Sequence, residues 1–252
     1  MKILELDIGN SRIKWRLLDT SNQTGVGMGQ ENDLEVLAAN LAQVEPAAIR
    51  LCSVRSRAET DRLRLWCLKR WNIEPVEATV VRHCGGVTNN YEDMSRLGVD
   101  RWLAMLAAYR ASSGSCVIVD AGTALTIDIV SGTGQHQGGY IVPGLGLMAA
   151  SLEQNTSIRL TEPPPPASLV PGHATDTAVR NGTLAAVVSL VQQVLLRISA
   201  QEPDVKLFLS GGDAETLAAH INSDNIFYFD NIEVASALVL DGLAIACPFA
   251  SE

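Results

Sequence analysis

Short apolar runs that end at glycine-containing turns alternate along this chain with segments of helical periodicity. In the first half, Leu4–Asp19 is typical of two strands joined by a turn. The elements expected next are a strand over Gly25–Gln30, a helix over Asn32–Gln43, a strand over Ala48–Val54, a helix over Ala58–Trp71 and a strand over Ile73–Val80. Because hairpins come first and helical crossovers later, this order predicts a mixed sheet.

The second half begins after an irregular stretch over Arg82–Leu97, a helix from Gly98 to about Ala111 and a linker of small residues. Its expected elements are a strand pair over Val117–Val130, a strand over Gly138–Val142, a helix to about Glu153, a proline-rich loop over Thr161–Pro171, a helix over Thr175–Ser199, a strand over Val205–Leu209 and a helix after Asp213, then a strand over Ile226–Phe229 and a helix over Val234–Ala246. The linker places a domain boundary between residues 114 and 115.

One strand-turn-strand pattern occurs twice. Aligning Asp7 with Asp120 also aligns Gly9 with Gly122. In both copies an apolar strand ends at a carboxylate and is followed by a glycine that permits close approach of another group. A single Asp-Gly hairpin is common for structural reasons alone, but two copies about half a chain apart indicate an internal repeat. The repeat predicts two similar α/β halves, 1–114 and 115–252, whose turns converge on one polyphosphate.

Composition narrows the class of protein. The chain has 252 residues, of which 47% are hydrophobic, and a formal net charge of −9. The negative charge is unfavourable for non-specific binding to nucleic acid or to an anionic membrane. No uninterrupted apolar run reaches the length of a membrane span, and charged residues in the first strand are unlike a signal peptide. The five cysteines show no CxxC spacing, so we expect reduced thiols and a cytoplasmic protein.

Two further turns carry candidate chemistry. Asp100 lies at the predicted start of a helix, directly before Arg101. It is either a helix N-cap, for which Asp is a preferred residue, or a general base. Ser210-Gly211-Gly212-Asp213 follows a predicted strand, and taken alone it is an ordinary strand-to-helix turn. The two phosphate-type turns favour the catalytic interpretation of Asp100, because phosphoryl transfer needs a carboxylate that can accept the hydroxyl proton.

The combination of these motifs, in this order and over nearly the whole chain, resembles the acetate and sugar kinase, Hsc70 and actin superfamily, and within it the type III pantothenate kinases. The added markers are Asn90-Tyr91, Leu97 to Trp102, and Gly138 to Gly144. The resemblance implies two RNase H-like (actin-like ATPase) halves, each a mixed sheet flanked by helices. It also implies ATP-dependent phosphorylation of pantothenate to 4'-phosphopantothenate, the first step of coenzyme A biosynthesis.

The resemblance also implies a role for each matching residue. Asp100 is the catalytic base, Asp7 lies near Mg²⁺, and Asp120 holds a monovalent cation, potassium or ammonium. The residues implied in ATP and phosphate binding are Asp7, Gly9, Asn10, Ser11, Gly122, Thr123, Ala124, Ser210, Gly211, Gly212 and Asp213. The residues implied in pantothenate binding are Tyr91, Gly98, Arg101 and Thr175. Thr175 would come from the other subunit of a homodimer, although Thr177 lies close by.

Three functions compete on this basis. We adopt the interpretation that the protein is a pantothenate kinase. The second candidate is another small-molecule kinase of the superfamily, such as a sugar kinase, which would share the phosphate turns. A non-enzymatic regulator is the third, since some relatives carry names of transcriptional accessory factors. The acidic charge and the complete set of aspartates weigh against it. Two apolar helices, Val187–Leu196 and Leu238–Ala246, are either core of the second half or partly covered by a second copy.

Overall fold

The computed structural model describes residues 1–20, 24–223 and 227–249. The chain forms two compact units. The first consists of Met1–Arg110 together with the C-terminal segment that begins at Ala237, and the second is Ala111–Ser236. The first boundary therefore lies close to the predicted one at residue 114, but the C-terminal segment belongs with the first unit rather than with 115–252.

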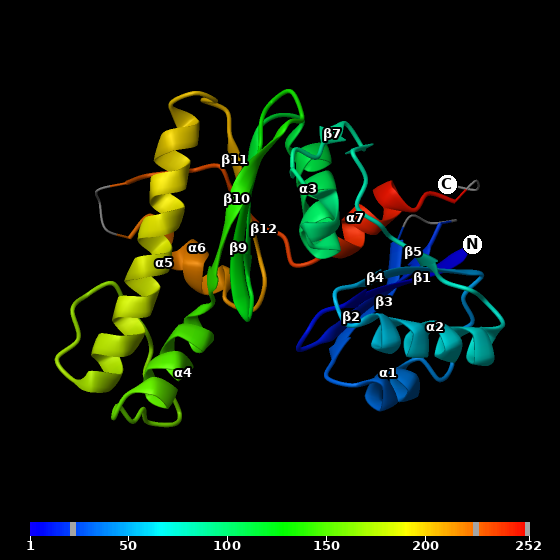
Figure 1. Cartoon of the computed structure of the whole chain (residues 1–252), viewed down its shortest axis with the longest axis horizontal. Helices are drawn as coiled ribbons and strands as arrows, with labels where there is room; N and C mark the ends of the chain where they lie inside the picture. Colours follow the sequence, from blue (N-terminus) through cyan, green and yellow to red (C-terminus); the bar gives the residue numbers. More distant parts are fainter. Residues whose placement is uncertain (21–23, 224–226, 250–252) are drawn as a thin grey trace. The chain divides into compact units, whose positions relative to one another are not determined.

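The first unit is built on a five-stranded sheet with the order β3-β2-β1-β4-β5 (Figure 1). Its strands are β1 Lys2–Ile8, β2 Ile13–Asp19, β3 Thr24–Glu31, β4 Ala48–Ser53 and β5 Val76–Glu77. The first three strands pair antiparallel, whereas β4 and β5 continue the sheet parallel to β1. The other elements are α1 Leu34–Asn40, α2 Arg57–Trp71, β6 His83–Cys84, β7 Val87–Thr88, the 3₁₀ helix η1 Met94–Arg96, α3 Val99–Ser112 and α7 Leu238–Ala246.

The second unit has a sheet with the order β10-β9-β8-β11-β12. Its strands are β8 Cys116–Ala121, β9 Ala124–Val130, β10 His136–Pro143, β11 Lys206–Ser210 and β12 Ile232–Val234. Its helices are α4 Leu145–Asn155, α5 Thr175–Ser199 and α6 Ala214–Ile221. Strands β8, β9 and β10 pair antiparallel and β11 and β12 continue parallel to β8. The two sheets thus have the same strand order and the same pairing directions, as the repeated sequence pattern predicts.

The two faces of the first sheet differ in polarity because side chains alternate along each strand. One face carries Leu4, Leu6 and Ile8 into an apolar core with α1 and α2. The opposite face carries Glu5 and Asp7, which are 0% and 7% exposed. Helix α7 contacts β1 and β4. The C-terminal helix therefore packs on the sheet that carries these buried polar groups.

The core of the second unit lies between its sheet and helices α5 and α6. Helix α5 is long and apolar enough to cross a membrane by length and composition alone. Its buried residues include Leu184, Val187, Val191 and Leu195, which pack with the strands. This spacing of three and four residues puts them on one helix face, so the apolar character of α5 has a structural use within its own unit.

Two predicted elements differ from the structure near the C-terminus. The strand expected over Ile226–Phe229 is wrong for its described part, since Phe227 to Asn231 have no strand and Ile226 lies outside the described residues. Asn222 bonds both backbone polar groups of Phe229, which satisfies them without a neighbouring strand. Helix α7 begins at Leu238 rather than Val234 because Val234 pairs with Leu209, and Ala235 continues that pairing with a bond to Leu209.

A third difference concerns β5, which covers only Val76–Glu77 of the strand predicted over Ile73–Val80. The helix at Thr175–Ser199 has the predicted bounds, and α1 begins after Asp33, whose side chain accepts from the Val36 N–H as a helix cap. Elements with strong periodicity or a clear capping residue were thus predicted well, whereas short edge strands depend on pairing with a neighbour.

Candidate active site

The first phosphate-type turn follows β1, and Asp7 occupies the last position but one of that strand. Asp7 lies opposite Lys14 on β2 and opposite Cys52 on β4. The turn closes with a bond from the Gly9 N–H to the Arg12 carbonyl at 2.9 Å, and Asn10 and Ser11 within it are exposed. A carboxylate at a strand end therefore adjoins an exposed turn with backbone N–H groups and a hydroxyl, a combination suited to holding a cation beside phosphate.

Asp100 lies in the first turn of α3, where its Oδ1 accepts from the Arg101 N–H at 2.8 Å. A Cβ atom at Gly98 would lie 2.5 Å from this oxygen, so a glycine at position 98 leaves the carboxylate room. Cys52, which is fully buried, interacts with both Asp7 and Asp100 and is hydrogen-bonded to Asp7. Burial, followed by these two carboxylates, raises the pKa of the Cys52 thiol well above its usual range. The first unit thus brings Asp7 and Asp100 to the same thiol.

Tyr91 and Arg101, which the sequence resemblance implies in binding pantothenate, are in contact. The Arg101 guanidinium donates to the Tyr91 hydroxyl at 3.0 Å and lies 5.6 Å from the centre of its ring. Arg101 is 8% exposed, so it is a largely buried cation rather than a solvated surface charge. Arg101 follows Asp100 directly, which places a cation that can pair with a carboxylate beside the candidate base.

Sequence reasoning missed Asn89 in this region. Asn89 is fully buried, and its Oδ1 accepts from the Tyr91 N–H at 2.9 Å. No hydrogen-bond acceptor for its Nδ2 occurs among the described residues. A buried donor without a partner is costly, at about 1–3 kcal/mol, so it commonly serves a ligand or a buried water. The dipeptide Asn89-Asn90 before Tyr91 was the only signal in the sequence.

The second unit assembles the remaining motifs around the end of β8. Asp120 accepts at Oδ1 from the Ser210 hydroxyl at 2.9 Å, and these residues are opposite each other on β8 and β11. The Asp213 N–H donates to the Ala121 carbonyl at 3.1 Å. Burial raises the pKa of the Asp213 carboxyl. The second phosphate turn and the predicted adenosine turn are therefore joined directly.

Two glycines make this junction sterically feasible. Gly211 has φ +91, and a Cβ there would lie 2.4 Å from the Ala121 carbonyl oxygen. Gly144, from the Gly138–Gly144 motif, donates its N–H to the Thr123 carbonyl at 2.9 Å, and a Cβ there would lie 2.1 Å from the Gly122 carbonyl oxygen. Backbones approach so closely at both places that a side chain cannot be inserted without moving the turn. All three motifs of the second unit meet at Ala121–Ala124.

The repeat extends to a pair of residues that sequence reasoning missed. In the first sheet, Cys52 lies opposite Asp7 on the neighbouring parallel strand. In the second sheet, Ser210 lies opposite Asp120 in the same way. Both side chains are buried and both bond their aspartate. Ser210 was predicted only as an adenosine-motif residue, and Cys52 only as a reduced thiol. The signal that identifies both residues is the register between the parallel strands, and this register is known only once the strands are paired.

Thr175 is the first residue of α5 and is exposed. The Thr177 hydroxyl donates to the Ala174 carbonyl at 3.0 Å and accepts from the Ala174 N–H at 3.2 Å. Thr177 therefore caps the helix, whereas Thr175 presents its side chain at the surface. The sequence left the choice between these two threonines open, and the local geometry favours Thr175 as a ligand contact.

No group of three or more His, Cys, Asp or Glu side chains that could hold a metal ion occurs in the part of the chain that the structure describes. Mg²⁺ that arrives with a nucleotide does not require such a group, because it is usually held by one or two carboxylates together with phosphate oxygens and water. Asp7 is the carboxylate at the first turn that fits this requirement. Asp120 and the carbonyl oxygens of its turn provide hard oxygen ligands for a cation in the second unit.

Comparison with known proteins agrees with these features. A family model described as type III pantothenate kinase matches residues 3–197. A type III pantothenate kinase from Pseudomonas aeruginosa is 38% identical over 253 residues, which cover 98% of this chain and 99% of the relative.

Solved structures place the fold in the same group. A Campylobacter jejuni protein named as a candidate Baf family transcriptional activator has a TM-score of 0.60 at 23% identity, over 95% of this chain and 94% of that chain. A Sinorhizobium meliloti protein named as a candidate 2-dehydro-3-deoxygalactonokinase has a TM-score of 0.56 at 15% identity, over 99% and 98%. These likenesses concern the fold, which is the two-domain fold of the actin-like ATPases and sugar kinases. The family model and the full-length relative show that this chain belongs to the type III pantothenate kinase family.

Proposed function

We propose that this protein transfers the γ-phosphoryl group of ATP to the primary hydroxyl of pantothenate, giving 4'-phosphopantothenate in the cytoplasm as the first step of coenzyme A biosynthesis. Family membership supports the reaction. The observation that carries the assignment of residues is the arrangement of the first unit, where Asp7 and Asp100 share the Cys52 thiol and Arg101 holds Tyr91. The phosphate turn, the candidate base and the cation proposed to bind the acceptor thus belong to one unit.

Asp100 is the proposed base or hydroxyl-orienting group. Its Oδ1 is fixed by the Arg101 N–H, so the carboxylate is held in one orientation before substrate arrives. Phosphoryl transfer requires mainly positioning and charge stabilisation, and Asp100 receives the hydroxyl proton as the new P–O bond forms and ADP leaves. Arg101 and Tyr91 are proposed to bind the carboxylate and polar groups of pantothenate, and Gly98 is proposed as a further contact with the substrate.

The nucleotide side is proposed to use both turns. Asn10 and Ser11 in the first unit, and Gly122, Thr123 and Ala124 in the second, offer N–H and hydroxyl donors to phosphate oxygens. Ser210, Gly211, Gly212 and Asp213 are proposed to hold the adenosine. Mg²⁺, when bound beside Asp7 with the nucleotide, neutralises charge that develops on the phosphoryl oxygens.

Asp120 is proposed to hold a monovalent cation, potassium or ammonium. Ser210 donates to Oδ1 of Asp120, which orients the carboxylate at the end of β8. The neighbouring turn supplies carbonyl oxygens, which suit a weakly hydrated cation better than a divalent transition metal.

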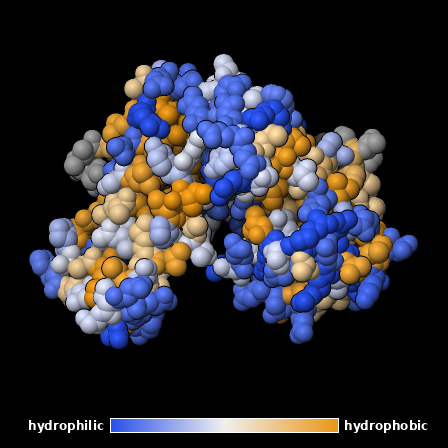
Figure 2. Space-filling view, viewed as in Figure 1, coloured by the Kyte–Doolittle hydropathy of each residue, from blue (hydrophilic) through white to orange (hydrophobic). Residues whose placement is uncertain are grey.

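We also propose a homodimer in which Thr175 contacts the pantothenate bound by the partner. The second unit exposes apolar side chains on β10 and α4, namely Ile141 at 61%, Leu147 at 46% and Leu152 at 39%. Figure 2 shows apolar surface over this part of the chain. Helix α7 is not proposed as part of this interface, because Leu238, Leu240 and Leu243 are buried and α7 packs in the first unit. Light scattering at micromolar concentration tests the dimer.

One assay separates the three candidate functions. The purified chain is incubated with Mg·ATP and a panel of pantothenate, hexoses and N-acetylhexosamines, and ADP release is measured. Phosphorylation of pantothenate alone is the expected result. Turnover of a sugar in preference to pantothenate would instead favour a sugar kinase, and ATP binding without turnover of any alcohol would favour a regulator.

A further inference from the structure

Arg55 lies beside the first phosphate turn, although no motif in the sequence marks it. The strands β1 and β4 run parallel and side by side, with Ile8 opposite Ser53. The Val54 N–H donates to the Ile8 carbonyl at 3.1 Å, which keeps the two chains together just beyond the strands. The chain that leaves β4 therefore reaches position 55 next to the chain that leaves β1 at Gly9.

The half-buried side chain of Arg55 turns toward this neighbour. Its Nε donates to the Gly9 carbonyl at 2.8 Å. No hydrogen bond or ion pair of its two terminal nitrogens occurs among the described residues. It acts electrostatically on the Glu59 carboxylate, which accepts from the Ser56 N–H at 3.2 Å and from the Ser56 hydroxyl at 2.6 Å. The positive charge of Arg55 is thus directed at the phosphate turn and is not neutralised by a direct salt bridge.

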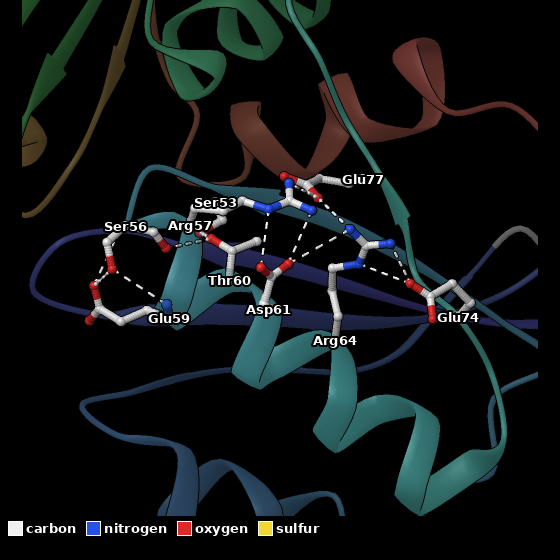
Figure 3. A network of polar contacts seen from close by, with 9 residues as sticks. All are labelled: Ser53, Ser56, Arg57, Glu59, Thr60, Asp61, Arg64, Glu74 and Glu77. Carbon is white, nitrogen blue, oxygen red and sulfur yellow. Dashed lines mark hydrogen bonds and ion pairs between the residues drawn. The ribbon is translucent and has the colours of Figure 1, made fainter.

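The neighbouring arginines of α2 behave differently. Arg57 pairs with Asp61 at 3.0 Å and with Glu77 at 3.4 Å, and Arg64 pairs with Glu74 and Glu77 (Figure 3). These pairs join α2 to the segment around β5. Asp61, Glu74 and Glu77 are thus engaged by Arg57 and Arg64, whereas the Nε of Arg55 bonds the phosphate turn.

The bond to Gly9 has a consequence for the turn. Gly9–Asn10 is not among the cis peptide bonds of the chain, and in a planar trans peptide the C=O and the following N–H point in opposite directions. A guanidinium fixed on the Gly9 carbonyl therefore directs the Asn10 N–H to the other side of the turn. A charged donor on the carbonyl also polarises the peptide, which makes the N–H a stronger donor to an anion.

We propose that Arg55 is a positioning residue of the phosphate turn, which holds the Gly9–Asn10 peptide so that the Asn10 N–H faces an oxygen of the ATP phosphates. This inference rests on the proposed function for the identity of the ligand. Arg55 acts through the peptide, so its loss weakens nucleotide binding without altering the acceptor side, where Tyr91 and Arg101 lie in other segments.

The test compares Arg55→Met with Arg57→Met. Both remove one guanidinium from the same segment, but Arg57 is 65% exposed and bonds only carboxylates away from the turn. For Arg55→Met, KM for ATP is expected to rise about tenfold. This factor corresponds to the loss of a charge-assisted hydrogen bond of about 1.4 kcal/mol. KM for pantothenate is expected to stay within about twofold of the wild type. For Arg57→Met, both constants are expected within about twofold of the wild type.

Thermal unfolding establishes that each variant is folded, and Arg55→Lys replaces Arg55→Met if the latter is not. Lys keeps the charge without the planar fork, and its expected rise in KM for ATP is about threefold. A KM for ATP within twofold of the wild type in the folded Arg55 variants overturns the inference, as does an equal rise in both KM values. If the wild type does not phosphorylate pantothenate, the proposed function fails, and equilibrium binding of ATP to the same folded variants still decides the role of Arg55.

Discussion

The buried charges on the α7-facing side of the first sheet allow a quantitative prediction of stability. Glu5 accepts from Arg50 at 2.9 Å and from Arg16 at 2.7 Å, and both Glu5 and Arg50 are 0% exposed. Arg50 also donates to the Cys247 carbonyl at 2.8 Å, which ties the end of α7 to β4. Burial raises the pKa of Glu5, whereas Arg16 and then Arg50 act to lower it. The two arginines therefore offset part of the cost of removing the Glu5 charge from water.

Glu5→Leu removes the carboxylate that pairs with the buried Arg50 guanidinium, whereas Arg16 retains its ion pair with Asp241 at 2.5 Å. Breaking a buried pair by removing one partner costs about 3–5 kcal/mol. For a chain of this size, where each kcal/mol lowers Tm by about 2–4 °C, the expected fall is roughly 6–20 °C. The double variant Glu5→Leu/Arg50→Met removes both members of the buried ion pair, and is expected to be more stable than Glu5→Leu.

The assay is urea unfolding followed by tryptophan fluorescence. Trp15, Trp66, Trp71 and Trp102 all lie in the first unit, so the signal reports the unit that contains the cluster. Additive losses, in which the double variant is less stable than the wild type by the sum of the losses in Glu5→Leu and Arg50→Met, would refute the argument that Glu5 and Arg50 act as one buried pair.

Three further predictions concern the site and the thiols. Asp100→Asn keeps the size of the side chain but loses its charge, and kcat is expected to fall by on the order of 10²- to 10⁴-fold while ATP binding is retained; turnover near that of the wild type would remove Asp100 from the mechanism. Activity at constant Mg²⁺ is expected to be much lower in sodium than in potassium or ammonium, and Asp120→Asn to weaken this dependence; equal rates in all three salts would contradict the cation site. Burial raises the pKa of Cys67 and Cys116 to about 12, and of the less enclosed Cys84 by less, so Cys84 is expected to react first with a thiol reagent at pH 8 and the other cysteines mainly after unfolding, as mass spectrometry of the labelled protein can verify.

The sequence alone was sufficient for the elements with strong local signals and for the repeat. Asp7 and Asp120 each follow an uninterrupted apolar strand and precede a glycine, and that pattern predicts a strand ending in a turn from local preferences only. The long helix over Thr175–Ser199 was predicted with its bounds because its apolar residues recur at helical spacing over many turns. The family resemblance then supplied roles for residues such as Asp100 that local pattern leaves undecided between a cap and a base.

Tertiary structure decided the contacts between residues that are distant in sequence. Cys52 and Ser210 became partners of Asp7 and Asp120 only through parallel pairing of β4 with β1 and of β11 with β8, and register between such strands is set by the packing of both faces. Arg55 reaches Gly9 for the same reason. The assignment of α7 to the first unit likewise depends on where its apolar face and the buried Arg50 find partners, which is a property of the folded chain and not of the helix sequence.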